Sequence, residues 1–366
     1  MKVLHIVSNL SVRNGVMSVI MNYYRHFDTN NIEFDFLYFD DKEVEYKSEI
    51  EKIGGKVYKI NRTKNPIKLL SQINRFIKKN ASNYQIIHVH ELYLISALIG
   101  IKKKNKSIKI IAHAHATKFS ENKLKAIRNR IMSIPNAFVP NYLFACSKDA
   151  GVAIFGKRFK DIGNIMNNSI DVSKFYPNNE ERKALRNQLK IEDKYVIGHV
   201  GNFNIQKNHE FLIDVFNELQ KDKDNVVLIL VGDGELRKNI IEKCERLGIS
   251  DKIIYLGTRN DVNKIMNAFD CFVFPSIYEG LGIVLIEAQA TGIPCVFSDV
   301  VPKEANIIKE NNTTISLKSD LKVWTKAIID SQNKKIENPK KRIQEAGYDI
   351  NIEAKEMQEF YRKIVE

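Results

Sequence analysis

Glu279 and Glu287 are eight positions apart, in a stretch that combines an apolar strand, a glycine-rich turn and a helix. The strand is expected at Cys271–Phe274, and the helix opens near Gly282 and stops at Gly292. A strand, a glycine-rich turn and a helix N-terminus together make an anion site at the carboxyl end of a sheet. Carboxylates do not bind an anion, so we expect them to bind hydroxyl groups beside it. That combination suggests a nucleotide sugar.

Glu287 lies in a helix that is otherwise apolar, at residues 283–286, Ala288 and Ala290. We therefore expect the helix to be mostly buried, and a buried carboxylate without a partner destabilises a fold. The alternative is that Glu279 and Glu287 are solvent-exposed residues of a turn and a helix. We favour a binding role over this alternative.

Three more segments are expected at the same edge of the second half of the chain. Lys207 lies near a helix start and would place positive charge beside a phosphate, although a surface lysine is the alternative. Residues 232–234 form a strand-to-helix turn in which Asp233 is expected to be an N-cap. Residues 257–261 end another strand, where the backbone would line a base pocket and Arg259 would contact phosphate.

Histidines gather at strand ends in the first half, as His88 and His90 and as His113 and His115. The i, i+2 spacing points each pair to one side of an extended segment. A metal clamp would need a third ligand, and none is evident, so we expect a histidine at a cleft mouth, hydrogen-bonded to a backbone carbonyl. The Asp-x-Asp at 222–224 lies in a charged loop. We therefore expect no metal cofactor and expect basic groups and a helix N-terminus to stabilise a diphosphate.

The order of elements around these residues is typical of two doubly wound parallel sheets. In the first half the predicted strands are residues 3–7, 34–39, 56–60, 86–90, 109–113, 142–145 and 162–166. The predicted helices between them are residues 16–26, 67–79, 92–103, 122–133 and 148–155. A polar loop and Gly15 follow the first strand at the edge where such folds bind ligands. A single glycine without G-x-G-x-x-G is a weak signal for a dinucleotide.

The pattern starts again after a polar, turn-rich segment at residues 167–180. The predicted strands of the second half are residues 195–200, 226–231, 252–256, 271–274 and 294–297. The predicted helices are residues 208–220, 235–247 and 262–269 and the one that opens near 282. Length alone favours two domains. We predict Rossmann-like domains at 1–172 and 173–350 that face each other across a cleft, and a last helix at 351–366 that crosses back to the first.

The composition is that of a soluble globular protein, with 44% hydrophobic and 28% charged residues among 366. No apolar segment suits a signal peptide or a membrane span, and four scattered cysteines favour a reducing cytoplasm. Residues 1–170 carry 28 Lys+Arg against 13 Asp+Glu, whereas the remainder carries 29 against 31. The basic excess, densest at 102–106 and 118–130, would suit nucleic acid, an anionic membrane or a phosphorylated substrate. A solvated face is the alternative.

The stretch from Pro275 to Pro294 resembles the E-x7-E motif of retaining family-4 glycosyltransferases of GT-B fold. The residues that carry the resemblance are Pro275-Ser276, Glu279-Gly280, Gly282, Glu287-Ala288, Gly292 and Pro294. Gly201 with Phe203, Gln206-Lys207-Asn208, Gly232-Asp233-Gly234 and Leu256-Gly257 fit the same family. The strings at 22–25, 34–37, 87–90, 111–115 and 144–148 are similar to the branch that builds bacterial capsular or exopolysaccharides.

The resemblance implies roles for matching residues. Glu279 would lie over the donor sugar, and Glu287 would bind the ribose hydroxyls. Lys207 would neutralise the diphosphate, which the backbone N–H groups of Gly280, Leu281 and Gly282 would hold. The first-domain histidine of the family falls on His115 or His113. We prefer His115, because it stands at the strand's end, where it would contact the reacting sugar or its acceptor.

Two positions depart from the family pattern. Asn202 stands where the family usually has arginine, which leaves Lys207 with less help unless Arg259 compensates. The glycine pair after the first strand is reduced to Asn14-Gly15, so only Gly15 remains there for the contact to donor or acceptor that the resemblance implies.

These features predict an enzyme that moves a hexosyl unit from a nucleoside-diphosphate sugar, expected to be UDP-linked, to a glycan or lipid-linked acceptor. The family implies retention of configuration, and its branch implies bacterial surface polysaccharide synthesis. The basic first domain would attract the anionic inner face of the cell membrane. One alternative is a GT-B-fold UDP-sugar epimerase, which has no acceptor. Another is a nucleic-acid-binding protein, although residues 102–109 lack interleaved aromatics, so we expect no nucleic-acid partner.

Overall fold

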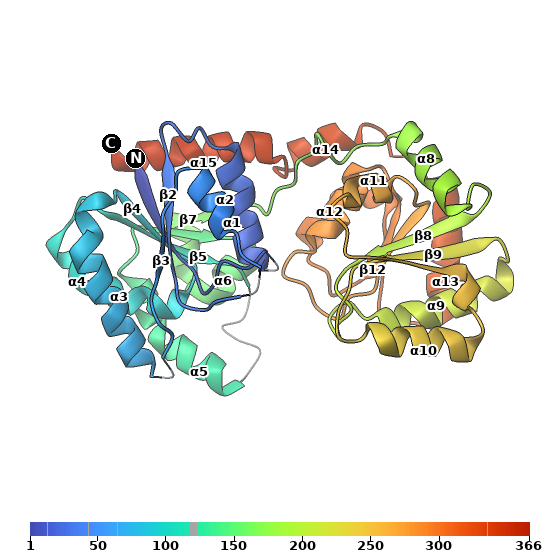
Figure 1. Ribbon diagram of the computed structural model, residues 1–366, viewed down its shortest axis with the longest axis horizontal. Coiled ribbons are helices and arrows are strands. Elements are labelled where there is room, and N and C mark those ends of the chain that lie inside the picture. Colours follow the sequence, from blue (N-terminus) through green and yellow to red (C-terminus); the bar gives the residue numbers. More distant parts are fainter. Residues whose placement is uncertain (13, 43, 64, 117–122, 335) are drawn as a thin grey trace. The chain divides into compact units, whose positions relative to one another are not determined.

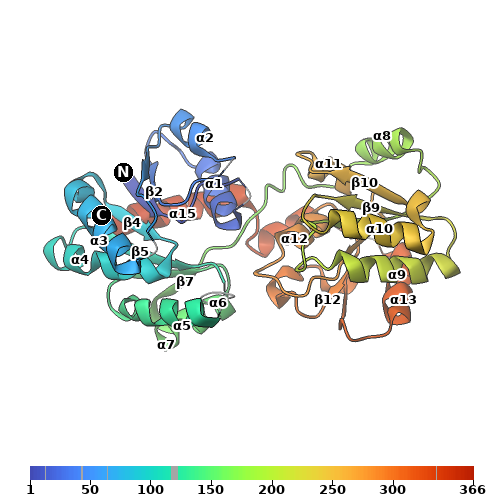
Figure 2. The same ribbon diagram turned by 60° about the horizontal axis from the view of Figure 1, so that its bottom comes forward.

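The computed structural model describes residues 1–12, 14–42, 44–63, 65–116, 123–334 and 336–366. Contacts divide the chain into two compact units, Met1–Ser169 together with Ile350–Glu366, and Ile170–Asp349. We call them the first and the second unit. Each contains one parallel sheet with helices packed on it, so the fold is α/β with two Rossmann-like domains (Figures 1 and 2).

The sheet of the first unit has the strand order β3-β2-β1-β4-β5-β6-β7 among the described residues. Its strands are β1 Lys2–Ile6, β2 Glu33–Tyr38, β3 Val57–Lys59, β4 Ile86–Val89, β5 Lys109–Ala114, β6 Tyr142–Ala145 and β7 Gly163–Ile165. Its helices are α1 Gly15–His26, α2 Lys47–Lys52, α3 Pro66–Asn80, α4 Ile99–Lys104, α5 Lys123–Met132, α6 Lys148–Phe155, α7 Lys157–Ile162 and α15 Ile350–Val365. The order reverses between β1 and β4, which is the point where such sheets bind ligands.

Both faces of this sheet are buried under helices. Leu4 and Ile6 of β1 belong to a core formed with α3, α4 and α6, whereas Val3 packs in another core with α1, α2 and α15. The last helix packs on α1, and the Tyr361 hydroxyl lies 2.7 Å from Nδ1 of His88 on β4. Residues at the end of the chain therefore complete the core of the first unit.

The sheet of the second unit has the order β10-β9-β8-β11-β12-β13 among the described residues. Its strands are β8 Tyr195–Val200, β9 Val226–Val231, β10 Ile253–Gly257, β11 Cys271–Phe274, β12 Cys295–Ser298 and β13 Thr313–Ile315. Its helices are α8 Asn179–Leu189, α9 His209–Asp222, α10 Arg237–Leu247, α11 Val262–Met266, α12 Ile283–Ala290, α13 Leu321–Asp330 and α14 Pro339–Glu345. Here the order reverses between β8 and β11.

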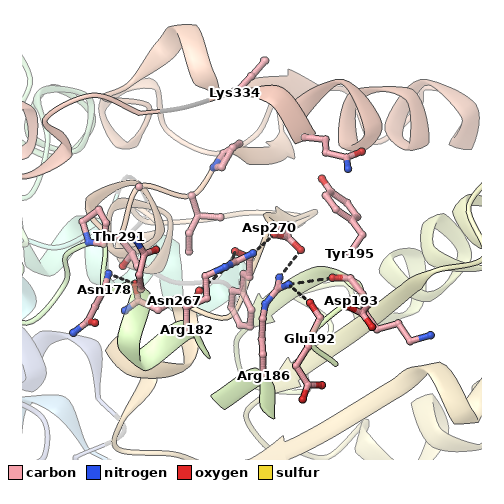
Figure 3. A pocket seen from close by; sticks show the side chains of 18 of the residues that line it. Asn178, Arg182, Arg186, Glu192, Asp193, Tyr195, Asn267, Asp270, Thr291 and Lys334 are labelled. Atoms are coloured by element: carbon pink, nitrogen blue, oxygen red, sulfur yellow. Dashed lines mark hydrogen bonds and ion pairs between the residues drawn. The ribbon is translucent and has the colours of Figure 1, made fainter. Parts of the chain in front are cut away.

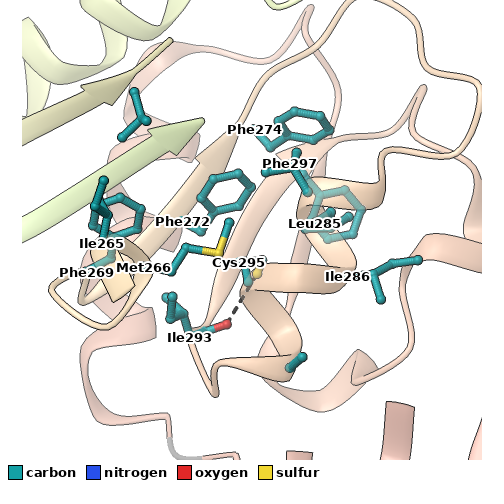
Figure 4. Packing of buried hydrophobic residues seen from close by; sticks show 14 of the residues in the cluster. Ile265, Met266, Phe269, Phe272, Phe274, Leu285, Ile286, Ile293, Cys295 and Phe297 are labelled. Carbon is teal, nitrogen blue, oxygen red and sulfur yellow. Dashed lines mark hydrogen bonds between the residues drawn. The ribbon is translucent and has the colours of Figure 1, made fainter. Parts of the chain in front are cut away.

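Strand β9 shows why this sheet is buried on both faces. Val227, Ile229 and Val231 belong to the core that α11, α12 and α14 cover, and the residues alternating with them belong to the core under α9, α10 and α13. Figure 4 shows the first of these cores, in which Phe272 and Phe274 of β11 lie beside Leu285 of α12. This packing fixes α12 against the end of β11.

The predicted strands lie within one residue of the observed ones. Elements that the sequence pattern did not predict are α2, α7, α8, β13, α13 and α14. The helix expected at 92–103 begins as a 3-10 helix, Leu92–Leu98, before α4, and the helix expected at 262–269 ends at Met266. The start of the helix expected at 122–133 lies outside the described residues.

The unit boundaries differ slightly from the predicted 172/173 and 350/351. The Ile170 N–H donates to the carbonyl of Tyr348 at 2.9 Å, and Val172 is buried in the core of the second unit, so residues 170–172 belong there. Helix α8 begins at Asn179, inside the segment expected to be linker. No helix in the described ranges is long and apolar enough to cross a membrane.

Candidate functional site

The carboxyl ends of β8 and β11 bring two loops together where the strand order of the second unit reverses. The Ile277 N–H donates to the Gln206 carbonyl at 2.8 Å, and the Asn208 side-chain amide donates to the Pro275 carbonyl at 3.1 Å. Gln206 also donates through Nε2 to the Tyr278 carbonyl at 3.1 Å. Hydrogen bonds therefore join the loop after β8 to the loop after β11.

Lys207, on the first of these loops, and Glu279, on the second, form an ion pair. Lys207 Nζ lies 2.7 Å from Glu279 Oε1, and the second carboxylate oxygen accepts a hydrogen bond from Gln206 Nε2 at 3.2 Å. Their side chains expose only 16% and 6% of their surfaces, and Lys207 Nζ lies 4.5 Å from the ring centroid of Phe274. A shielded pair of this kind interacts more strongly than an exposed one.

Helix α12 points unpaired donors at the same edge. The backbone N–H groups of the five residues from Gly280 to Val284 have no hydrogen-bond acceptor among the described residues. Gly282 is the N-cap with φ +84°, and a Cβ at this position would lie 3.2 Å from the ring of Phe274. The left-handed backbone and the close approach together require glycine. Gly280 is exposed and Leu281 is buried, so the turn is anchored by Leu281.

Glu287 lies on α12, and its side chain makes no hydrogen bond to any described residue. The residue is partly exposed, but the protein around it raises the pKa of its carboxyl to about 8, with the charge of Lys207 opposing the shift. Removal from water favours the neutral form of a carboxyl. An uncommitted carboxyl in this position can bind hydroxyl groups of a ligand.

The other residues predicted for the second unit differ in their placement. Asn202 is exposed on the loop after β8. Arg259 is exposed, and its Nε and one terminal nitrogen lie 2.8 and 2.6 Å from the two carboxylate oxygens of Asp261, so its charge is already matched. No contact joins Arg259 to Lys207 among the described residues. A contact of Arg259 with the donor phosphate, in compensation for Asn202, stays a prediction.

The turn at 232–234 supports the loop after β8, although the N-cap prediction for Asp233 is wrong. Helix α10 begins later, with Leu236 at its N-cap, and the Asp233 carboxylate accepts from the Gly234 N–H at 2.8 Å. A Cβ at Gly232 would lie 2.1 Å from the carbonyl of Gly201. The glycine is needed for this approach of two backbones, which holds the start of the loop.

In the first unit, the loop after β1 leads to Gly15, the first residue of α1. Gly15 is exposed, and a Cβ there would have no atom within 4 Å. Asn14 caps the helix by accepting hydrogen bonds from the N–H groups of Val16 and Met17. The packing of this glycine therefore indicates no special role.

Five histidines line up across β1, β4 and β5 of the first unit. His5 Nδ1 lies 3.0 Å from His90 Nε2, and His90 Nδ1 lies 2.7 Å from His115 Nε2. His88 and His113 stack beside them, with ring centroids 5.3 Å apart. Burial lowers the pKa of His115 to about 3. His115 is thus hydrogen-bonded to another histidine rather than to a backbone carbonyl, which corrects the prediction.

The sequence pattern missed His5, the third partner of His88 and His90, and did not show that His90 is the third partner of His113 and His115. The register pairs His5 of β1 with His88 of β4, so the two rings lie on one face of the sheet. The signal in the sequence was the position of His5 on the first predicted strand. His113 is fully buried on β5, and His115 follows the strand and is partly exposed.

A cavity of about 680 Å³ lies at the opposite edge of the second sheet, where β8, β11 and β12 begin. Figure 3 shows that Arg182 and Arg186 point at Asp270 within it. Asp270 also accepts a hydrogen bond from the Val196 N–H at 2.7 Å. The ion pairs of Arg182 and Arg186 with Asp270 tie α8 to the sheet.

The family described as "Glycosyl transferases group 1" matches residues 181–349. "Putative glycosyltransferase EpsF" of Bacillus subtilis is 30% identical over 369 residues, with 95% of this chain and 93% of the relative covered. "Capsular polysaccharide biosynthesis glycosyltransferase CapH" of Staphylococcus aureus is 26% identical, with 98% of each covered.

An Escherichia coli relative, "UDP-Gal:alpha-D-GlcNAc-diphosphoundecaprenol alpha-1,3-galactosyltransferase", is 25% identical, with 74% of this chain and 72% of the relative covered. Among solved structures, Anabaena HepE in complex with UDP has a TM-score of 0.79 at 18% identity, covering 99% of this chain and 100% of that one. This likeness shows a shared fold, that of the GT-B glycosyltransferases.

Proposed function

The chain belongs to the glycosyl transferases group 1 and is a glycosyltransferase, and we propose that it moves a hexosyl unit from a UDP-linked sugar to a glycan or lipid-linked acceptor with retention of configuration. The observation that carries the proposal is the Lys207–Glu279 pair beside five unpaired N–H groups at the start of α12. Positive charge, free donors and two carboxylates at one sheet edge match the parts of a nucleotide sugar.

The diphosphate of the donor would lie against the N–H groups of Gly280, Leu281 and Gly282. The Lys207 ammonium has three donors, one of which reaches Glu279 in this structure, so the others are available to phosphate oxygens. As the glycosidic bond to the diphosphate breaks, negative charge builds on the leaving oxygen, and fixed donors stabilise that charge most. We propose that this transfer needs no divalent metal on the diphosphate, and equal turnover with and without added Mg²⁺ or Mn²⁺ tests the point.

Glu279 would accept hydrogen bonds from hydroxyls of the transferred sugar, while Gln206 holds its second oxygen. Glu287 would bind the ribose hydroxyls, and its raised pKa makes it able to donate as well as accept near neutral pH. In the first unit, His115 is the better candidate for contact with sugar or acceptor, because His113 is fully buried. Fixed positions for both substrates would supply much of the rate.

Names of relatives support the substrate classes. The Escherichia coli relative is named for UDP-Gal as donor and a diphosphoundecaprenol-linked sugar as acceptor, and the Staphylococcus aureus relative for capsular polysaccharide synthesis. We extend these classes to this chain: a UDP-sugar, an acceptor on a lipid diphosphate, and a place in bacterial surface polysaccharide synthesis. An epimerase is not favoured, because the family match is to glycosyltransferases. The absence of a nucleic-acid partner stays a prediction.

We propose peripheral attachment to the inner face of the cell membrane through the first unit. Helix α5 exposes Leu124, Ile127 and Ile131 to 80%, 60% and 60%, at the spacing of one helix face, next to exposed Arg128 and Arg130. Apolar and basic side chains on one surface helix suit an anionic bilayer. Part of the basic run at 118–130, residues 118–122, lies outside the described residues.

Two measurements test attachment and donor class. We expect Ile127→Glu to reduce sedimentation with anionic liposomes severalfold, while Ile67→Glu, on the exposed face of α3, leaves it unchanged. Equal binding by both variants would contradict attachment through α5. Calorimetry with UDP-, GDP- and ADP-sugars should show the tightest binding for a UDP-sugar, and turnover should require an acceptor. An epimerised product from UDP-sugar alone would instead establish the epimerase.

A further inference from the structure

Five of the eight histidines of the chain gather at the carboxyl ends of the three central strands of the first sheet. They come from β1, from β4 and the residue after it, and from β5 and the residue after it: His5, His88, His90, His113 and His115. Their rings stack at centroid distances between 3.9 and 5.3 Å. The transfer proposed above uses at most one of them, so the cluster as a whole needs another explanation.

The hydrogen bonds of the cluster leave several buried ring nitrogens without partners. His5 bonds to His90, His90 to His115, and His88 to the Tyr361 hydroxyl. Among the described residues, His5 Nε2, His88 Nε2 and both nitrogens of His113 have no partner, although they are buried. A native protein rarely leaves so many buried polar atoms unsatisfied in one place. A ligand held by His113 would give one of these nitrogens a partner.

We propose that His90, His113 and His115 bind a transition-metal ion of the zinc class. One nitrogen from each of the three rings lies within 4.8 Å of the others. With its proton on Nε2, His90 donates to His5 Nδ1 at 3.0 Å, which leaves its Nδ1 lone pair facing His115. This outer hydrogen bond fixes the ring of a ligand histidine in the way metal sites commonly do.

The chemistry of the ligands selects the kind of metal. Burial lowers the pKa of all three rings, so they are neutral near pH 7, and neutral imidazole is the form that binds metal. Three imidazoles without a carboxylate or thiolate suit Zn²⁺, Co²⁺, Ni²⁺ or Cu²⁺ and do not suit Mg²⁺ or Ca²⁺. The ion would therefore differ from one that binds a diphosphate.

The second triad, His5, His88 and His90, fits less well. All three of its side chains are buried, and His88 Nδ1 already bonds to Tyr361, so an ion would have no entry path and no open position. His115 is partly exposed, which gives the chosen triad access to solvent and room for a fourth ligand such as water.

His90 and His115 need only a small rearrangement to share an ion. His90 Nδ1 and His115 Nε2 lie 2.7 Å apart, whereas two nitrogens on one tetrahedral zinc, each about 2.05 Å from the metal, are about 3.3 Å apart. On binding, the proton of His115 moves to its Nδ1, and the two rings separate by about half an ångström. Neither nitrogen of His113 has a partner among the described residues, and the one that it offers to the triad lies within 4.8 Å of those of His90 and His115.

The experiment is a titration of the chelator-treated protein with Co²⁺, followed by visible absorption, and then displacement of the Co²⁺ by Zn²⁺. We expect one equivalent of tetrahedral Co²⁺. His115→Gln should weaken binding at least about tenfold, and His113→Gln should weaken it further. His26→Gln, in the same unit but outside the cluster, and His199→Gln, in the second unit, should bind as the wild type does.

The proposal is overturned if the wild type takes up no Co²⁺ at the cluster, or if His115→Gln binds as tightly as His26→Gln. His113 is in the core, and its variant can fail to fold, so circular dichroism is recorded for each protein. If His113→Gln does not fold, Co²⁺ binding by the variant of the partly exposed residue, His115→Gln, tests the proposal. Binding that is lost only in His199→Gln would place the ion in the second unit and would equally overturn the proposal.

Discussion

The carboxyl edges of the two sheets are built alike and carry opposite chemistry. In the second unit, Lys207 and Glu279 face each other 2.7 Å apart. In the first unit, the polar groups at the equivalent edge are histidines whose pKa burial lowers, to about 3 for His5 and His115. Burial removes charge when no partner of opposite sign is present, whereas a nearby partner preserves charge. One Rossmann-like scaffold can thus present a charged site or a neutral one.

The largest expected effect comes from removing the charged pair of the second unit. We expect Lys207→Ala and Glu279→Ala each to lower kcat/KM by about 10²–10³-fold, because each removes a group that acts on the donor as charge develops. Steady-state assays with a UDP-sugar and a lipid-linked acceptor measure this loss. Lys221→Ala, whose lysine pairs with Glu218 at the surface, is the matched control and should retain activity. Near-normal turnover in both site variants would refute the assignment.

The first unit, whose sheet carries the neutral histidines at its carboxyl edge, should lose stability at acid pH. The ordinary pKa of histidine is 6.5, and burial lowers the pKa of His5 and His115 to about 3, so between these values the unfolded chain binds protons that the folded chain does not. Stability of the first unit is complete above pH 6.5 and falls as pH drops, by up to about 1.4 kcal/mol per ring and pH unit. Cys146, the only cysteine of the first unit, is buried, so its labelling by a thiol reagent reports the opening of that unit. If Cys146 were protected from labelling equally from pH 7 to pH 4, the predicted loss of stability in acid would be contradicted.

Glu287 should give the opposite slope in the second unit. Its pKa is raised to about 8 from 4.5, so the folded state holds a proton that the unfolded state loses as pH rises between these values. The free energy of unfolding should therefore fall from pH 5 to 8 by no more than about 3 kcal/mol, given the access of this side chain to water. Trp324, the only tryptophan, reports unfolding of this unit by fluorescence. Glu287→Gln should flatten the slope, and an unchanged slope would exclude Glu287 as its source.

The smallest effect concerns the turn before α12. Gly282→Ala should destabilise the second unit by about 1–2 kcal/mol, because alanine is strained at φ +84° and its Cβ meets Phe274. Gly100→Ala, in α4 with open space around it, should be neutral or stabilising by up to about 1 kcal/mol. Urea unfolding measures both. Equal stability of the two variants would show that the turn relaxes freely.

Residues with local signals were predictable from the sequence. The strands are short apolar runs with clear ends, and the turn around Glu279 is punctuated by glycine, so both were located closely. Helix α8 was not predicted, because it has few apolar residues, and Arg182 and Arg186 also hold it through Asp270, almost ninety residues away. The histidine cluster was only half visible, because the register that brings His5 beside His88 is a property of the sheet.

The contact between α15 and α1 has a consequence for the order in which the protein forms. Helix α15 follows the other elements of the first unit in the sequence with the whole second unit between them, yet its Tyr361 fills the core of the first unit and bonds to His88. The second unit is continuous in sequence and can fold without a distant segment. The core of the first unit, although its strands come first in the chain, stays open until α15 has been made and packs on it. The histidine cluster would therefore take its final form only after the second unit has been synthesised.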